Sequence, residues 1–249
     1  MKIIVQNIAT TYTDRGTGSV ILCLHGWKDS LRTFDAIEPA LLKKGRVIAL
    51  DLPGFGETGN PPEAWQVGDY VRFVADFLKK IDVEADYLVG HSFGGRIIIK
   101  GVGEGTLKAR KIVLMASAGI TPEQTVYTKM SRVPLKMLGW ILRVPPFIFF
   151  RSFMRRMFYT AIGSDYFNAG ALQETFIKII AEDLSDYARK IFAPTLLIWG
   201  KDDAATPVKL GEKLRDLIRN SRLEVFPNTG HFVHHEKATE VGGLIEGFL

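Results

Sequence analysis

The sequence predicts an α/β protein with one mostly parallel sheet, and two observations lead to this prediction. Short runs rich in Val, Ile and Leu, each bounded by Gly, Pro or Asp, alternate with stretches of helical periodicity. This alternation is typical of a parallel sheet flanked by helices. The length of 249 residues suits one large domain or one domain with an insertion. Hydrophobic residues at 47% and charged residues at 24% exclude a wholly disordered, collagen-like or coiled-coil chain.

The expected elements follow one another in a simple order. A hairpin should open the chain, over Lys2–Gln6 and Ala9–Thr13. Apolar residues at helical spacing over Val67–Ile81 predict an amphipathic helix on the surface of the sheet. The expected buried strands are Val20–Leu24, Val47–Leu50, Tyr87–Val89, Lys111–Met115, Thr195–Trp199 and Leu223–Phe226.

The alternation breaks once, between Ala116 and Pro194, where no strand is evident. We therefore expect a sheet domain of residues 1–116 and 194–249 that carries an inserted helical cap of residues 117–193. The net charge of +5 is concentrated in this insertion, since the stretch from Lys129 to Arg156 contains basic residues and no Asp or Glu. These basic residues are Lys129, Arg132, Lys136, Arg143, Arg151, Arg155 and Arg156.

Aromatic residues surround the basic ones in this insertion, and two roles are open. In the first, the aromatic residues of the cap line an apolar pocket for the acyl group of the substrate. In the second, the basic face of the cap binds an anionic lipid surface. Nucleic-acid binding is disfavoured because no known nucleic-acid-binding module accompanies the charge. The aromatic residues are Tyr127, Trp140, Phe147, Phe149, Phe150, Phe153, Phe158, Tyr159, Tyr166 and Phe167.

The chain is expected to be soluble and cytoplasmic. Its one cysteine, Cys23, cannot form an internal disulfide, which favours a reducing compartment. The first apolar stretch, Ile3–Val5, is too short for a signal peptide. No apolar run reaches the length of about 18–20 residues that a spanning helix needs.

The strongest chemical signal is a G-x-S-x-G motif between an expected strand and a helix, formed by Gly90, Ser92 and Gly94. A serine at a sharp strand-to-helix turn adopts strained backbone angles, and its neighbours two positions away need minimal side chains. The turn exposes the serine hydroxyl, and the N-terminus of the helix adds N–H groups and partial positive charge. Ser92 is therefore the candidate nucleophile.

A serine hydroxyl needs a general base and a group that orients the base. His231 is the favoured base, because it follows the last expected strand in a loop that can reach the sheet edge. His91 adjoins Ser92, but the tight turn should point its ring elsewhere, and His234 and His235 should begin a solvated helix. The chain contains five histidines, His25, His91, His231, His234 and His235.

The orienting acid should follow a strand between Ser92 and His231. Asp202 and Asp203 both lie directly after the expected strand Thr195–Trp199. The resulting order of serine, aspartate and histidine is the order of α/β-hydrolase triads. Position alone leaves both aspartates open.

With these motifs, the sequence resembles the α/β-hydrolase-fold serine hydrolases that carry a lid, such as esterases and lipases. The resemblance implies an acid three residues after Gly200, which is Asp203, and an oxyanion hole formed by the backbone N–H groups of Trp27 and Phe93. It implies no cofactor and no metal. The matching motifs span the sheet domain: His25-Gly-Trp27, Asp51-Leu-Pro-Gly-Phe-Gly56, Gly90-His-Ser-Phe-Gly-Gly95, Trp199-Gly-Lys-Asp-Asp203 and Gly230-His-Phe232.

Some relatives are excluded by the same residues. Epoxide hydrolases and haloalkane dehalogenases of this fold use aspartate at the position of Ser92. The acid that some members carry after the strand Lys111–Met115 is absent, since Ala-Ser-Ala follows. Carbon–carbon bond hydrolases usually have a glycine-rich stretch after the first His-Gly, where this chain has Trp-Lys-Asp-Ser, and this difference disfavours them.

The sequence thus favours a carboxylic-ester hydrolase that acts through an acyl-enzyme on small or medium, largely apolar acyl substrates. The alternatives with the same three residues are a carbon–carbon bond hydrolase and a cofactor-free perhydrolase. A non-catalytic binding protein on a hydrolase scaffold is a further alternative, although such a protein has no need of Ser92, Asp203 and His231 together. The oligomeric state stays open.

Overall fold

The computed structural model describes residues 1–120 and 170–249. The chain divides into two compact units, one of Met1–Thr121 with Lys178–Leu249 and one of Pro122–Ile177. The second unit lies within the expected insertion of residues 117–193, and the role of that insertion as a cap stays a prediction. The basic cluster, its aromatic residues and the lipid-binding hypothesis all lie outside the described residues.

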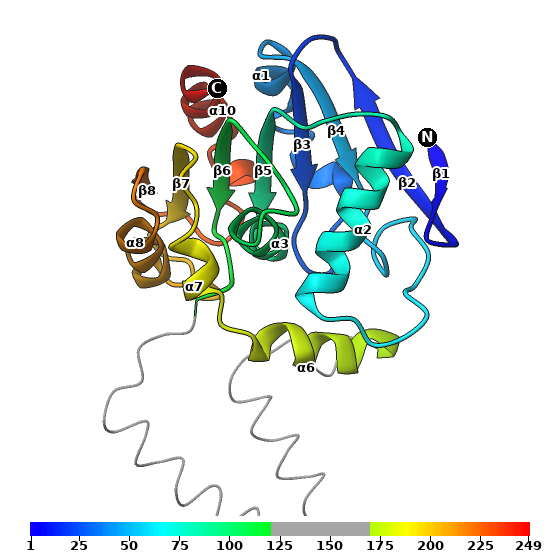
Figure 1. Cartoon of the computed structure of the whole chain (residues 1–249). Helices are drawn as coiled ribbons and strands as arrows, with labels where there is room; N and C mark the ends of the chain where they lie inside the picture. Colours follow the sequence, from blue (N-terminus) through cyan, green and yellow to red (C-terminus); the bar gives the residue numbers. More distant parts are fainter. Residues whose placement is uncertain (121–169) are drawn as a thin grey trace, which may run out of the picture. The chain divides into compact units, whose positions relative to one another are not determined.

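The first unit is built on an eight-stranded sheet with the order β1-β2-β4-β3-β5-β6-β7-β8 (Figure 1). β1 and β2 form the expected antiparallel hairpin, β2 also pairs antiparallel with β4, and all later pairs are parallel. The predicted mostly parallel sheet is therefore confirmed. The strands are β1 (Lys2–Val5), β2 (Ile8–Arg15), β3 (Val20–Leu24), β4 (Arg46–Leu50), β5 (Tyr87–His91), β6 (Lys111–Met115), β7 (Thr195–Gly200) and β8 (Ser221–Phe226).

Several strands are longer than the sequence predicted, among them β5 and β8. β5 continues to His91, because His91 pairs with Met115 in the parallel ladder. β8 begins at Ser221, which pairs with Thr195. Polar residues extend these strands because backbone pairing to a neighbouring strand continues beyond the apolar run. The extension of β5 brings the end of the strand directly to Ser92.

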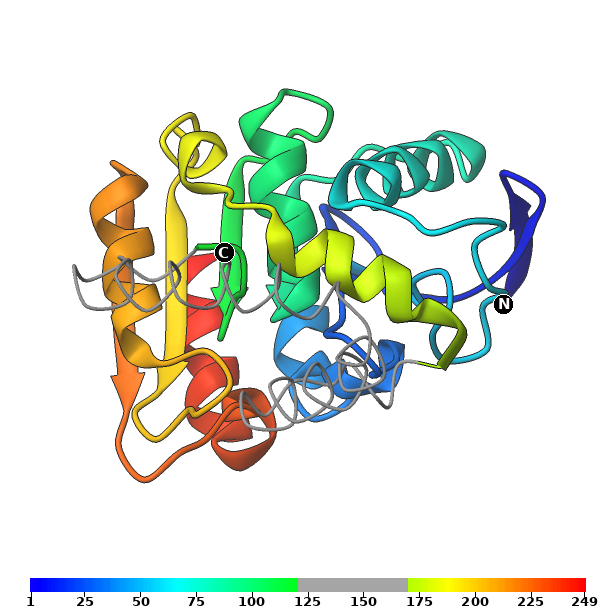
Figure 2. The same ribbon diagram turned by 90° about the horizontal axis from the view of Figure 1, so that it is seen from below.

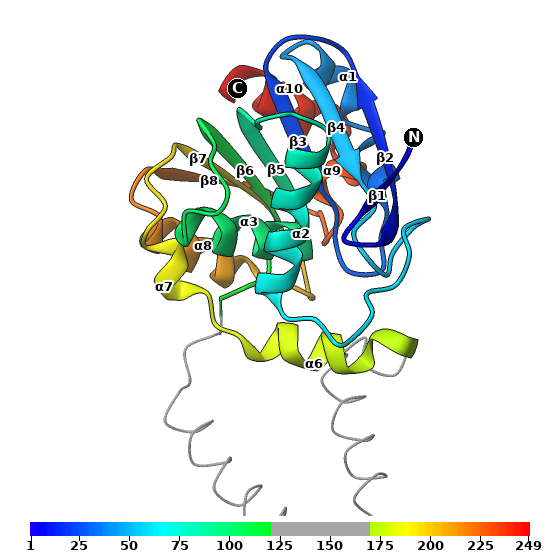
Figure 3. The same cartoon turned by 45° about the vertical axis from the view of Figure 1, so that its right-hand side comes forward.

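Helices cover both faces of the sheet, with α2, α3 and α8 on one face and α1 and α10 on the other (Figures 2 and 3). α2 confirms the predicted amphipathic helix and begins with a reciprocal cap between Gln66 and Asp69. The helices within residues 1–120 and 170–249 are η1 (Leu31–Phe34), α1 (Glu38–Leu42), α2 (Val67–Lys80), α3 (Phe93–Gly103), η4 (Gly170–Leu172), α6 (Gln173–Ala181), α7 (Ser185–Ala188), α8 (Val208–Leu217), α9 (Val233–Glu236) and α10 (Ala238–Phe248).

The core lies between the sheet and its helices and is formed mainly by the central strands. All five residues of β3 are buried, as are the last four residues of β5 and β6. Each fully buried Val, Leu or Ile side chain stabilises the fold by about 1.5–3 kcal/mol. This packing fixes the carboxyl ends of β3, β5, β7 and β8 at one edge of the sheet. No helix among the described residues is long and apolar enough to cross a membrane.

Candidate active site

The candidate nucleophile stands at the turn between β5 and α3. Ser92 has φ 50° and ψ −107°, a strained conformation for a residue with a side chain. Backbone hydrogen bonds hold this turn, because the Ser92 N–H donates to the Met115 carbonyl at 3.0 Å and its carbonyl accepts from the Ala118 N–H at 3.1 Å. The half-buried Ser92 therefore has the backbone conformation that the G-x-S-x-G motif predicted.

The two glycines of the motif are required by close backbone contacts. A Cβ on Gly90 would lie 2.7 Å from the Gly95 nitrogen, and one on Gly94 would lie 1.9 Å from the Leu24 carbonyl oxygen. Real Cβ atoms do not approach backbone atoms this closely, so a larger side chain would push α3 away from the sheet. The motif thus places the N-terminus of α3 directly beside Ser92.

The candidate acid and base are hydrogen bonded to each other. His231 Nδ1 lies 2.8 Å from Asp203 Oδ2. Because a carboxylate accepts, Nδ1–H donates and Nε2 is left free to accept a proton. Asp203 is 4% exposed, whereas the neighbouring Asp202 is exposed. Of the two aspartates that position left open, the structure therefore brings Asp203 to His231.

Thr206 and the backbone hold the Asp203 carboxylate in place. The Ala205 and Thr206 N–H groups both donate to Oδ1 at 2.8 Å, and the Thr206 hydroxyl lies 2.7 Å from Oδ2. Burial raises the pKa of Asp203, but the hydrogen bonds from His231 and Thr206 outweigh the effect of burial. The pKa of Asp203 therefore lies below its usual value. Asp203 is therefore ionised at neutral pH and able to stabilise a positive charge on His231.

The loop that carries Trp27 lies against the nucleophile turn. A Cβ on Gly26 would lie 3.3 Å from the Ser92 Cβ, and the Trp27 and Phe93 rings pack edge to face with centroids 5.6 Å apart. Phe93 is the first residue of α3, so its N–H is one of the helix donors without an intrahelical acceptor. The two residues expected to form an oxyanion hole are thus adjacent to each other and to Ser92.

Within the described residues, no hydrogen bond joins the Ser92 hydroxyl to the His231 ring. In enzymes without bound substrate this contact is commonly long and shortens when substrate binds. The link between the two residues is instead structural, because the ring of His91, directly before Ser92, has its centroid 4.8 Å from that of His231.

His25 is excluded as the base by its own hydrogen bonds. It is fully buried, its Nδ1 lies 2.7 Å from the Gly26 carbonyl, and its Nε2 accepts from the Leu52 N–H at 2.9 Å. Burial lowers its pKa, so the ring stays neutral. Both ring nitrogens are occupied by backbone groups, and His25 therefore ties the loop after β3 to the loop after β4.

The expectation that His234 begins a solvated helix is wrong. His234 is in the short helix α9, but it is fully buried, and its Nε2 lies 2.9 Å from the Thr33 hydroxyl. Burial, with the nearby His235 and His231, lowers the pKa of His234 to about 3. The first two residues of α9, Val233 and His234, are buried. The polar sequence His-His-Glu does not suggest this burial.

The buried His234 predicts a loss of stability in mild acid. In the unfolded chain this ring takes up a proton near pH 6.5, while in the folded chain it stays neutral down to about pH 3. The unfolded state therefore binds more protons in this window, and the free energy of unfolding falls by up to about 1.4 kcal/mol for each unit by which the pH is lowered. His234→Gln should flatten this slope.

Urea unfolding at pH 7.5 and at pH 4.5 measures the effect. The difference between the two pH values should be smaller for His234→Gln than for the wild type. Equal differences in both proteins would contradict the assignment of His234 as a buried neutral ring.

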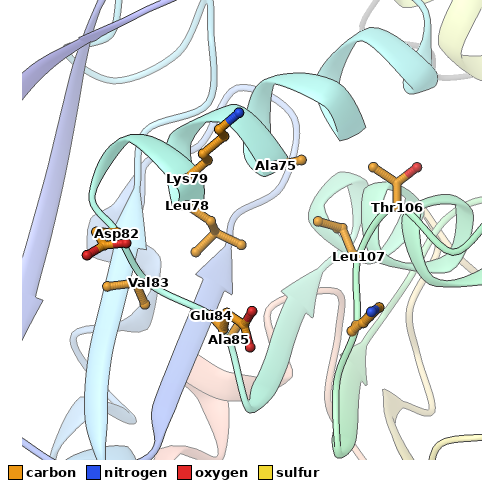
Figure 4. Close-up of a pocket in the computed structure, with 10 residues that line it drawn as sticks. Ala75, Leu78, Lys79, Asp82, Val83, Glu84, Ala85, Thr106 and Leu107 are labelled. Atoms are coloured by element: carbon orange, nitrogen blue, oxygen red, sulfur yellow. The ribbon is translucent and has the colours of Figure 1, made fainter.

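A separate pocket lies at the amino ends of β5 and β6 (Figure 4). It has a volume of about 450 Å³ and is lined by the end of α2, by the residues before β5 and by those before β6. Its described lining contains no serine, histidine or cysteine, so it offers none of the chemistry found at the carboxyl ends of the strands. In the described part of the chain, no cluster of His, Cys, Asp and Glu could hold a metal ion.

Comparison with known proteins agrees with this fold. A profile of the alpha/beta hydrolase family matches residues 21–242. A 2-hydroxy-6-oxononadienedioate/2-hydroxy-6-oxononatrienedioate hydrolase of Cupriavidus pinatubonensis is 27% identical over 261 residues, covering 95% of this chain and 89% of that protein.

Solved structures with the same fold include a phospholipase and an esterase. The crystal structure of a bacterial membrane phospholipase A has a TM-score of 0.77 and 25% identity, and the match covers 100% of this chain and 84% of the other. An esterase from Exiguobacterium antarcticum has a TM-score of 0.75 and 23% identity, with 99% and 98% of the two chains covered.

Proposed function

Because the chain belongs to the alpha/beta hydrolase family, we propose that it is a serine hydrolase that cleaves carboxylic esters through an acyl-enzyme. The observation that carries the proposal is the combination of a strained serine turn at Ser92 with a hydrogen-bonded pair of Asp203 and His231. A serine, a free imidazole nitrogen and a buried carboxylate are the parts that nucleophilic acyl transfer requires.

Acylation proceeds in two steps through a tetrahedral intermediate, and the proton taken up in the first step is returned in the second. Ser92 Oγ attacks the ester carbonyl carbon while His231 Nε2 takes up the hydroxyl proton, which gives a tetrahedral oxyanion. The positive imidazolium is stabilised by the ionised Asp203 through the Nδ1–H bond at 2.8 Å. When the carbonyl reforms, the bond to the leaving oxygen breaks and His231 returns its proton to the departing alcohol.

Deacylation repeats these roles with water in place of serine. His231 removes a proton from water, the hydroxide attacks the acyl-enzyme, and the acid leaves as Ser92 recovers its proton. In both halves the Trp27 and Phe93 N–H groups would donate to the oxyanion, each contributing about 3 kcal/mol in the transition state. The packing of Trp27 on Phe93 holds the loop after β3 against the first residue of α3.

The proposed substrates carry small to medium, largely apolar acyl groups. Aromatic residues support this choice, because Trp27, Phe55 and Phe93 form a cluster with ring centroids 4.8–6.3 Å apart beside the nucleophile turn. Phe55 and Phe93 are buried and Trp27 is half-buried, so an apolar acyl chain would pack against this cluster at Trp27. Each methylene group buried there gains about 0.8 kcal/mol.

The proposal predicts a rising kcat/KM along a series of p-nitrophenyl esters. From acetate to hexanoate, each added methylene should raise kcat/KM by up to about fourfold, since 0.8 kcal/mol corresponds to that factor. The increase should stop when the acyl site is full. A series that falls steadily from acetate onward would contradict an apolar acyl site, while leaving ester hydrolysis itself in place.

Carbon–carbon bond hydrolysis is the second candidate, and one observation favours it. The relative from Cupriavidus pinatubonensis, which aligns over 95% of this chain, is named as a hydrolase of a dienedioate. The Trp-Lys-Asp-Ser sequence after His25-Gly26 argues in the other direction. Assaying purified protein in parallel on p-nitrophenyl butyrate and on that dienedioate decides the matter, and a higher kcat/KM on the dienedioate would replace the ester proposal.

A further inference from the structure

His91 lies between two loops of the candidate site and bonds to the one that carries the base. It is the last residue of β5, directly before Ser92, and it is 1% exposed. Its Nε2 lies 3.2 Å from the backbone carbonyl oxygen of His231. The ring therefore contacts the base loop, and this is the direction in which the turn before Ser92 points it.

The other side of the same ring faces the loop that carries Trp27. His91 Nδ1 lies 3.9 Å from Asp29 Oδ2, which is too long for a hydrogen bond. Both atoms are buried and have no hydrogen-bond partner in the described part of the chain. A Cβ on Gly26 would lie 3.0 Å from His91 Nδ1, so the ring fills the space between this loop and the base loop.

These distances fix the tautomer of His91. Burial and the neighbouring His234 and His231 hold the pKa of His91 well below its usual range, so the ring is neutral and carries one proton. A proton on Nδ1 would leave the Nε2 lone pair against the His231 carbonyl, whereas a proton on Nε2 makes a hydrogen bond there. The proton therefore belongs on Nε2.

We infer that His91 is a positioning residue for His231, which it holds beside Ser92 through the Nε2–H bond to the His231 carbonyl. His91 touches no reacting atom in this scheme. It fixes the base loop relative to the strand that ends at the nucleophile, and the two rings pack with centroids 4.8 Å apart. The inference rests on the proposed function, and it extends that function to a residue outside the three expected to react.

Two amide substitutions separate this role from simple packing. In His91→Gln the side-chain amide nitrogen takes the place of Nε2 and can still donate to the His231 carbonyl. In His91→Asn the nitrogen takes the place of Nδ1 and points toward Asp29 instead. Both variants are neutral, polar and smaller than histidine. His235→Gln, in the same histidine cluster, is the matched control, because His235 donates to the Thr33 carbonyl and not to the base loop.

The first readout is kinetic, with kcat and KM on p-nitrophenyl butyrate expressed per active site titrated. His91→Gln and the control should stay near the wild-type kcat. His91→Asn should lose about 10²-fold in kcat with KM unchanged, the effect of misplacing a catalytic group by about 1 Å. Equal kcat in the Gln and Asn variants, whether high or low, or a larger loss in the Gln variant, would overturn the inference.

The second readout does not depend on esterase activity. Hydrogen–deuterium exchange of residues 227–233 reports the order of the base loop, and it should be faster in His91→Asn than in the wild type and in His91→Gln. If the wild type hydrolyses no ester, the proposed function fails and this exchange pattern still supports the positioning role. Unchanged exchange in His91→Asn would overturn it.

Discussion

Replacing Ser92 by alanine should abolish ester hydrolysis and leave the fold intact. The hydroxyl is the only atom of this chain that we propose to bond to the acyl group, so its loss removes covalent catalysis altogether. Removing a triad member leaves only the contribution of the oxyanion hole and of binding, a residual rate about 10³–10⁴-fold above water. Alanine should also relieve little of the strain at φ 50°, because the turn is held by backbone bonds to Met115 and Ala118.

The measurement is kcat/KM on p-nitrophenyl butyrate, with circular dichroism and thermal unfolding as checks on the fold. Ser117→Ala is the matched control. Ser117 follows β6 at the same edge of the sheet, and its buried hydroxyl has no hydrogen-bond partner among the described residues. This control should keep wild-type activity. A folded Ser92→Ala protein with undiminished kcat/KM would move the nucleophile to another residue.

Asp203→Asn should lower kcat by about 10⁴-fold, the effect of neutralising the acid of a triad. An amide at this position presents a donor to His231 Nδ1, which forces the proton onto Nε2 and leaves no lone pair for the Ser92 proton. Asp203 also accepts hydrogen bonds from Ala205 and Thr206, so the thermal unfolding temperature is measured alongside kcat.

Asp202→Asn is the natural control, because Asp202 is exposed and adjacent in sequence. Its kcat should stay close to that of the wild type. If Asp202→Asn were the more damaging substitution, the orienting acid would be Asp202, and the hydrogen bond between Asp203 and His231 would have no catalytic role.

Periodicity and turn residues predicted much of the fold. The apolar runs from Val20–Leu24 to Thr195–Trp199 located the central strands, because strands buried on both faces are continuously apolar. The spacing over Val67–Ile81 predicted α2, because apolar residues that recur at the helical period form one apolar face. Strand ends were less predictable, since backbone pairing extended β5 to the polar residue His91.

The candidate site was predictable where the chemistry is local in sequence. Gly90, Ser92 and Gly94 lie within one turn, and the turn itself requires those residue types. The choice of Asp203 needed the family resemblance, because two adjacent aspartates follow the strand and either could orient the base. The structure separates them by burial and by the bond to His231.

The supporting residues could not be predicted from their neighbours in sequence. Thr206 contacts Asp203 and the Ala116 carbonyl, and the latter is 90 positions away along the chain. His234 is polar in sequence and buried in the structure because Thr33, 201 positions away, offers it a hydrogen bond. Such contacts depend on tertiary packing, and the periodicity of the sequence does not predict them.

The most direct test of a serine acyl-transfer enzyme is covalent labelling by a fluorophosphonate, followed by peptide mass spectrometry. The folded wild type should gain one phosphonate, on the peptide that contains Ser92, and labelling should be absent in Ser92→Ala and strongly slowed in Asp203→Asn. A folded wild-type protein that gains no phosphonate, or gains it on a residue other than Ser92, would contradict the account.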